Sequence, residues 1–391
     1  MPLSATANVI RVIRDSILFS EQACMSIGSH TISIIRRETA MMEKRTFARI
    51  GLMGNPSDGF YGKTISSCIT NFHAKVELTE SRILRLLPHK TFDPTEFSSL
   101  KDLELTSNRD GYYGGIRLIY ATCKRFSEYC RENNIELDDR NYIVSYDTNI
   151  PRQVGLGGSS AIIVSLLKAL MEFYGLTDED IPLESQPNLV LSVETEELGI
   201  NAGLQDRVIQ TYGGTVFMDF DKQIMDSMKH GLYERMDSGL LPNLFLACMC
   251  GSGKDSGKMH NEMRFRFNQG DREIINAMSM FARFACEAKQ ALEEGDHKHF
   301  GVLMDMNFDL RRKIYGDAAI GESNLQMIEI SRSLGAPAKF PGSGGAVIGM
   351  YEDEEQYRRL KKAFLDHGFR FAKVEPQKLD ISGRSISSAN V

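Results

Sequence analysis

The stretch Pro151-Arg-Gln-Val-Gly-Leu-Gly-Gly-Ser-Ser-Ala161 carries most of the information about the fold. Residues 142–147 before it alternate as a half-buried strand does, and the apolar residues after it, from Ile163 onward, are spaced as on one face of a helix ending before Gly175. The stretch is therefore a glycine-rich loop between a strand and the N-terminus of a helix. Because backbone N–H groups and the positive end of the helix dipole gather there, the sequence predicts a site for the phosphates of a nucleotide.

Two common phosphate-binding loops do not match this spacing. The Walker pattern G-x4-G-K-[ST] is absent from the stretch, and G-x-G-x-x-G fails because Ser160 stands in place of its last glycine. The segment Gly251-Ser-Gly-Lys-Asp-Ser-Gly-Lys258 is one residue too long for a Walker loop and is followed by Met259 rather than Ser or Thr. A flexible turn with a serine cap is the alternative, but it explains three glycines and two serines together less well.

The composition indicates a globular protein of about two domains, since the chain has 391 residues, of which 42% are hydrophobic and 25% charged. A net charge of −6 disfavours a nucleic-acid binder, which is usually basic. No apolar run is long enough to predict a membrane span. The 7 cysteines are scattered without a C-x-x-C pair, which indicates reduced thiols and a cytoplasmic location.

The pattern along the chain suggests two domains between two less regular ends. Residues 1–45 lack clean periodicity, and we expect them to form a poorly ordered leader. An N-terminal domain over 46–235 contains the glycine loop, and a fresh series of strands and helices predicts a C-terminal domain over 236–375. The polar residues 376–391 read as a tail.

Three motifs resemble those of the GHMP kinases and occur in the order found in that family. The glycine loop resembles the second motif, P-x3-G-L-G-S-S-A, with one extra glycine. The segment Ala48-Arg-Ile-Gly-Leu-Met-Gly-Asn-Pro-Ser-Asp58 resembles the first motif, and Ala338-Lys-Phe-Pro-Gly-Ser-Gly-Gly-Ala346 resembles the third. The run from Arg45 to about Lys373 is most similar to the plant-type glucuronokinase branch of the family.

The resemblance implies an α+β fold of two domains, a ribosomal S5-like N-terminal domain and a ferredoxin-like C-terminal domain. It also implies an ATP- and Mg²⁺-dependent sugar 1-kinase that converts D-glucuronate to D-glucuronate 1-phosphate, which feeds nucleotide-sugar synthesis. A 1-kinase for galacturonate, arabinose or fucose is one alternative, and a non-catalytic sensor of sugar and nucleotide is another. The expected partners are thus a small sugar acid and ATP, with no nucleic acid and no membrane.

By the same resemblance, ATP is held by the glycine loop and the third motif. The residues implied are Gly155, Leu156, Gly157, Gly158, Ser159, Ser160, Ala161, Gly342, Ser343 and Gly344. Magnesium keeps several waters and takes only one or two protein oxygens. The resemblance assigns those oxygens to Ser160 and to Glu194, twelve residues before Asp206, with Glu196 and Glu197 as alternatives.

Asp206 and Arg49 are the residues that the resemblance assigns to catalysis. Asp206 lies between Gly203 and Gly213, as the catalytic aspartate of the family does. A carboxylate there can accept or orient the proton of the attacking hydroxyl, because phosphoryl transfer depends mainly on positioning and charge neutralisation. Arg49 would keep Asp206 ionised or stabilise the transferring group. A surface ion pair of Asp206 with Arg207, and a structural Arg49, are the alternatives.

The sugar site is the least readable part of the sequence. Asp58 occupies the place where related kinases hold ring hydroxyls, and a carboxylate accepts two hydrogen bonds well. We expect Arg152 and Arg312 to bind the substrate carboxylate and Tyr113 to stack on the sugar, although core packing is an alternative for the tyrosine. Nothing in the sequence ranks the two arginines above three further basic residues, which are Arg311, Lys63 and Lys258.

Overall fold

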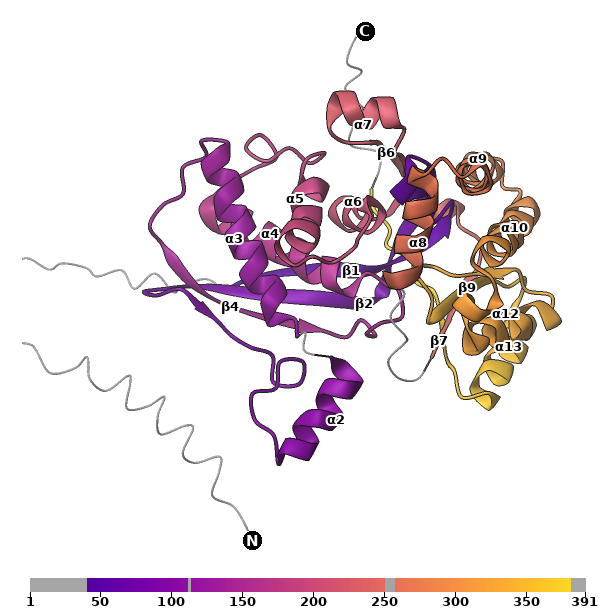
Figure 1. Ribbon diagram of the computed structural model, residues 1–391, viewed down its shortest axis with the longest axis horizontal. Coiled ribbons are helices and arrows are strands. Elements are labelled where there is room, and N and C mark those ends of the chain that lie inside the picture. Colours follow the sequence, from indigo (N-terminus) through magenta and orange to yellow (C-terminus); the bar gives the residue numbers. More distant parts are fainter. Residues whose placement is uncertain (1–40, 112–113, 250–256, 381–391) are drawn as a thin grey trace, which may run out of the picture. The chain divides into compact units, whose positions relative to one another are not determined.

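The structure is a computed structural model that describes residues 41–111, 114–249 and 257–380, with side chains except at 109–110 and 257–261 (Figure 1). Nearly all of the expected leader and Tyr113 lie outside the described residues. The described residues form one compact unit. Within its described part, no helix is both long and apolar enough to cross a membrane.

A six-stranded sheet is built from the first half of this unit. Its order is β3-β4-β2-β5-β6, with β1 also paired to β2. The strands are β1 (Met42–Met53), β2 (Lys63–Ser81), β3 (Arg85–Leu86), β4 (Asn141–Thr148), β5 (Thr215–Asp219) and β6 (Leu232–Met236). The long β2 contains both extended runs that the sequence suggests at 64–68 and 74–78, since its first half pairs with β5 and its second half with β4.

Helices cover one face of this sheet (Figure 1). Helix α4 (Gly158–Tyr174) packs on β1 and β2. It is buried from Ser160 to Met171 except at Lys168, because most of its residues are apolar. Gly175 ends it in the left-handed conformation, as expected. Around it lie α3 (Ile116–Glu132), α5 (Gln186–Ser192) with its π-helical continuation η2 (Val193–Glu197), and α6 (Leu204–Tyr212). Shorter elements are η1 (Ser57–Phe60), α2 (Leu100–Asp110), α7 (Lys222–Met228) and η3 (Ser238–Leu240).

A second sheet of four antiparallel strands follows, in the order β10-β7-β9-β8. Its strands are β7 (Leu244–Cys248), β8 (Ala338–Lys339), β9 (Ala346–Met350) and β10 (Arg370–Lys373). The helices of this half are α8 (Gly257–Asn268), α9 (Arg272–Glu293), α10 (His297–Tyr315), α11 (Asp317–Ile320), α12 (Glu322–Ser333) and α13 (Glu354–Asp366). Phe245, Phe308 and Phe364 belong to a separate apolar cluster between this sheet and its helices.

The third motif connects the two sheets. The Gly51 N–H of β1 donates to the Pro341 carbonyl at 2.8 Å. The buried Lys339 Nζ of β8 donates to the Gly51 carbonyl at 2.9 Å, to Asn55 Oδ1 at 2.6 Å and to the Phe340 carbonyl at 2.8 Å. These bonds hold the first and third motifs against each other, although nearly 300 residues separate them in the sequence.

Candidate active site

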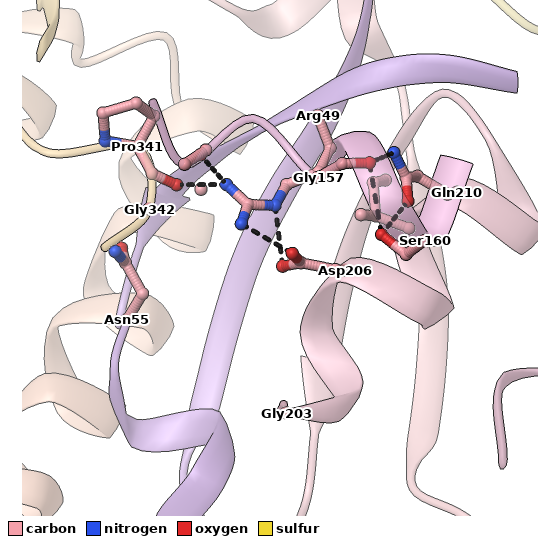
Figure 2. A network of polar contacts seen from close by, with 12 residues as sticks. Arg49, Asn55, Gly157, Ser160, Gly203, Asp206, Gln210, Pro341 and Gly342 are labelled. Atoms are coloured by element: carbon pink, nitrogen blue, oxygen red, sulfur yellow. Dashed lines mark hydrogen bonds and ion pairs between the residues drawn. The ribbon is translucent and has the colours of Figure 1, made fainter. Parts of the chain in front are cut away.

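An ion pair between Arg49 of β1 and Asp206 of α6 lies at the centre of the site (Figure 2). Nε and Nη2 of Arg49 donate to Oδ1 and Oδ2 of Asp206, each at 2.7 Å. The remaining Nη1 donates to the carbonyls of Gly155 at 2.6 Å and Pro341 at 2.8 Å. The expected contact between Arg49 and Asp206 is therefore present, and it touches both glycine-rich segments.

The glycine loop and the third-motif turn approach each other too closely for side chains. A Cβ on Gly155 would lie 2.9 Å from the backbone nitrogen of Ser343, and one on Gly342 would lie 2.2 Å from the Gly155 carbonyl oxygen. Gly155 and Gly157 also have φ values of +69° and +73°, which glycine adopts at little cost. The two segments thus form one surface of backbone groups at the N-terminus of α4.

Ser159 and Glu194 supply paired oxygen atoms beside this surface. The Ser159 hydroxyl donates to Glu194 Oε1 at 2.8 Å, while Arg207 forms a hydrogen-bonded ion pair with Glu194 Oε2. Glu194 is 0% exposed and lies in the π-helical turn η2, a distortion often found at functional sites. Arg207 Nη1 is also 3.7 Å from Asp206 Oδ2, so Glu194 and Asp206 share one charge network.

Ser160, the expected magnesium ligand, has other partners than Ser159. Its side chain is fully buried and its hydroxyl donates to Gln210 Oε1 at 2.5 Å and to the Gly157 carbonyl at 3.2 Å (Figure 2). The hydroxyl that faces Glu194 is that of Ser159. Leu156 and Ala161 are buried as well, so their backbone is what they offer to a ligand.

Asp58, in η1, lies close to the start of α6, the helix that contains Asp206. A Cβ on Gly203 would come within 2.4 Å of Asp58 Oδ2, so glycine at 203 permits the approach of η1 to α6. Burial, and then the charge of Asp206, raise the pKa of Asp58 to about 6, against the opposing effects of the Gln205 N–H, Arg49 and Arg207. A carboxyl group with a raised pKa thus lies near the ion pair of Arg49 and Asp206, as is common at functional sites.

The structure shows the surroundings of three basic residues considered for the substrate carboxylate. Arg312 is paired with Asp317 through two hydrogen bonds and its side chain is 41% exposed. Lys63 forms an ion pair with Asp219. Arg152, in the glycine-rich segment, lies over the ring of Phe92 at 5.7 Å.

Arg311, one of the three further candidates for the substrate carboxylate, lies against the third-motif turn. It is buried and donates to the carbonyls of Gly342 at 2.8 Å and Ser343 at 3.3 Å. Helical spacing contains the signal, because Arg311 shares the inward face of α10 with Met304 and Phe308, whereas Arg312 is turned about 100° away.

Comparisons with known proteins agree with this geometry. Residues 117–214 match the model of the "GHMP kinases N terminal domain", and residues 288–368 match "GHMP kinases C terminal". The chain is 47% identical to "Probable glucuronokinase 2" of Arabidopsis thaliana, over 89% of this chain and 94% of that protein. It is 46% identical to "Glucuronokinase 1" of the same plant, over 90% of this chain and 97% of that protein.

Solved structures share the fold at much lower identity. The galactokinase of Lactococcus lactis, complexed with galactose, superposes with a TM-score of 0.65 at 16% identity, covering 87% of this chain and 95% of that one. The phosphomevalonate kinase of Streptococcus pneumoniae gives a TM-score of 0.66 at 18% identity, covering 86% of this chain and 100% of that one. These likenesses support the α+β fold that the three motifs imply.

Proposed function

The chain belongs to the GHMP kinase family, and from this premise we propose that it transfers the γ-phosphoryl group of ATP to the anomeric hydroxyl of D-glucuronate. The glucuronokinases of Arabidopsis, at 46% and 47% identity along most of the chain, support the substrate. The observation that carries the chemistry is the ion pair of Arg49 and Asp206, held against the carbonyls of Gly155 and Pro341. This arrangement supports the proposal, because Arg49 joins the Asp206 carboxylate to both segments of the predicted phosphate site.

In this proposal the triphosphate binds the backbone of residues 155–161 at the N-terminus of α4, together with residues 342–344. Asp206 accepts a hydrogen bond from the anomeric hydroxyl and directs its oxygen at the γ-phosphorus. Arg49 holds the Asp206 carboxylate ionised and in place, and its positive charge favours the negative charge that spreads over the transferring group. Transfer is direct, without a covalent enzyme intermediate.

The described side chains fit a magnesium ion, with one change to the expected ligands. We propose that Ser159 and Glu194 hold Mg²⁺, because their oxygen atoms are 2.8 Å apart, while the Ser160 hydroxyl is committed to Gln210. When bound, the ion would neutralise charge on the β- and γ-phosphates. Arg207 fixes the other oxygen of Glu194 and so keeps Oε1 turned toward Ser159.

For the sugar, we propose that Asp58 accepts hydrogen bonds from ring hydroxyls beside Asp206. Arg152 and Tyr113 stay predictions for this pocket, whereas the exposed Arg312, paired with Asp317, is poorly placed for it. A cytoplasmic location also stays a proposal, supported by the free thiols of Cys68, Cys123, Cys130 and Cys286.

The test is a panel of initial rates with ATP and five sugars: D-glucuronate, D-galacturonate, L-arabinose, L-fucose and D-glucose. We expect the largest kcat/KM with glucuronate and a fall in kcat of about 10²- to 10⁴-fold in Asp206→Asn. A larger kcat/KM with another sugar would favour the alternative 1-kinases. Binding of ATP and glucuronate without turnover would favour the sensor.

A further inference from the structure

Arg311 is a buried cation without an acidic partner in the part of the chain that the structure describes. It is 4% exposed. Its guanidinium contacts the carbonyls of Gly342 and Ser343 and lies over the rings of Tyr315 and Phe340, at 5.4 and 5.3 Å from the guanidinium carbon. A guanidinium stays charged in proteins, and a buried charge without a counter-ion is costly. Such a group calls for an anion from outside the chain.

The contrast with Arg49 makes this more specific. Both arginines donate to carbonyls of the same turn, Arg49 to Pro341 and Arg311 to Gly342 and Ser343. Arg49 has its counter-ion in Asp206. Arg311 donates to two neutral carbonyls, and a guanidinium has five N–H donors, so further donors can bind a ligand. Two guanidinium groups therefore contact this turn, one with a carboxylate counter-ion and one without in the described part of the chain.

Arg311 also lies near the predicted sugar site. The negative charge of Asp58 acts on it, yet the two side chains form no ion pair among the described residues. The turn whose carbonyls Arg311 contacts also lies close to the glycine loop, because the Ser343 nitrogen is near Gly155. Arg311 is thus grouped with Asp58 and with the segments expected around the substrates.

We propose that Arg311 binds the carboxylate of the sugar substrate and makes the site selective for sugar acids over neutral sugars. This inference rests on the proposed kinase function and deepens it. A guanidinium matches a carboxylate with two parallel hydrogen bonds, and a neutral sugar would leave the buried charge unpaired. Charged groups buried to recognise one ligand feature give strong discrimination against analogues that lack it.

The experiment compares wild type with Arg311→Gln on D-glucuronate and on two neutral analogues, D-glucuronamide and D-glucose, used as substrates or as competitive inhibitors. We expect kcat/KM for glucuronate to fall on the order of 100-fold in the variant. The kinetic or inhibition constants of the neutral analogues and KM for ATP should change less than about 3-fold. Lys313→Gln, which removes an exposed cation from the same helix, is the matched control and should behave as wild type.

Three results would overturn the inference: an equal loss with charged and neutral sugars, a rise in KM for ATP with unchanged sugar selectivity, or no change in Arg311→Gln. If Arg311→Gln fails to fold, Arg311→Lys tests the inference instead. It keeps the positive charge but cannot form the two parallel hydrogen bonds of a guanidinium. It should reduce kcat/KM for glucuronate about 10-fold and leave the neutral analogues unchanged, and a loss of equal size with all three ligands would contradict us. A wild-type enzyme that does not turn over glucuronate would instead refute the proposed function.

Discussion

At the scale of single residues, the site is defined by how each buried charge is balanced. Asp206 is balanced by Arg49, and Glu194 by Arg207. Asp58 is less well balanced, because burial and the neighbouring Asp206 outweigh the nearby positive charges and raise its pKa to about 6. Because the ionised form of Asp58 is disfavoured in this way, we expect a ligand to bind this carboxyl group.

The raised pKa of Asp58 predicts a pH-dependent gain of stability in Asp58→Asn. Because folded Asp58 binds its proton more tightly than unfolded Asp58, its favourable contribution is complete below the unfolded pKa of 3.8 and is lost as pH rises through about 6. At pH 8 the variant should be more stable than wild type by about 3 kcal/mol, and at pH 4 by less than about 1 kcal/mol. Urea unfolding at both pH values measures this, and an equal difference at both would contradict it.

Replacing Ser159 and replacing Ser160, both at the start of α4, should have different effects on magnesium dependence and stability. Ser159→Ala removes an oxygen next to Glu194 and should raise the Mg²⁺ concentration for half-maximal turnover on the order of 10-fold. Ser160→Ala removes a buried hydrogen bond to Gln210 and should lower the free energy of unfolding by about 1–2 kcal/mol, with little change in Mg²⁺ dependence. Magnesium titrations of the rate and urea unfolding distinguish them, and a reversed pattern would restore Ser160 as the ligand.

These serines also show what the sequence can predict at this scale. The motifs located Asp206 and Arg49, and the contact between them is present. They could not tell Ser159 from Ser160, because successive helical residues point about 100° apart and only packing decides which one faces the site. The pairing of Glu194 with Arg207 was equally hidden, since it depends on the π-helical turn η2.

At the scale of elements, the site depends on the close approach of the glycine loop to the turn between β8 and β9. The absence of side chains at Gly155 and Gly342 is what lets the two backbones meet. The strand, loop and helix around residues 142–175 were predictable, because periodicity, glycine spacing and the cap at Gly175 all agree there. Helix α13 was not predicted, because its short amphipathic pattern lies in a strongly charged stretch.

Gly155→Ala should impair nucleotide binding specifically. The new methyl would lie 2.9 Å from the Ser343 nitrogen and would push the two segments apart, so KM for ATP should rise at least about 10-fold. Gly175→Ala is the matched control, since Gly175 has a similar φ of +72° but a Cβ there meets nothing within 4 Å. It should cost about 1 kcal/mol of stability and leave KM for ATP unchanged. Equal effects on ATP binding in both variants would refute the close-approach argument.

At the scale of the whole molecule, the first and third motifs are joined by hydrogen bonds between β1 and the end of β8. The order of the motifs predicted the family and its α+β fold, and the two sheets draw their strands from 42–236 and 244–373. The proposed domains, 46–235 and 236–375, stay a prediction. The hydrogen bonds of Lys339 could not be predicted from the sequence. Lysine is rarely fully buried, and the three acceptors that allow its burial are brought together only by the fold.

Lys339→Met should therefore weaken the fold as well as the site. The substitution keeps much of the side-chain volume but leaves the Gly51 and Phe340 carbonyls and Asn55 Oδ1 without this donor. We expect a loss of about 2–4 kcal/mol in the free energy of unfolding, measured in urea. Lys361→Met, at an exposed position of α13, is the control and should change it by less than about 0.5 kcal/mol. A stability equal to wild type in Lys339→Met would show that these bonds contribute little.

The central claim is that a nucleotide triphosphate on the loop 155–160 meets the anomeric hydroxyl of glucuronate beside Asp206. The most direct measurement is NMR of the product formed from ATP and [1-¹³C]glucuronate. We predict a phosphorus signal coupled to C1 with wild type, and a rate of its appearance lower by at least about 100-fold with Asp206→Asn. A phosphate attached to any other carbon, or an undiminished rate in the variant, would contradict the claim.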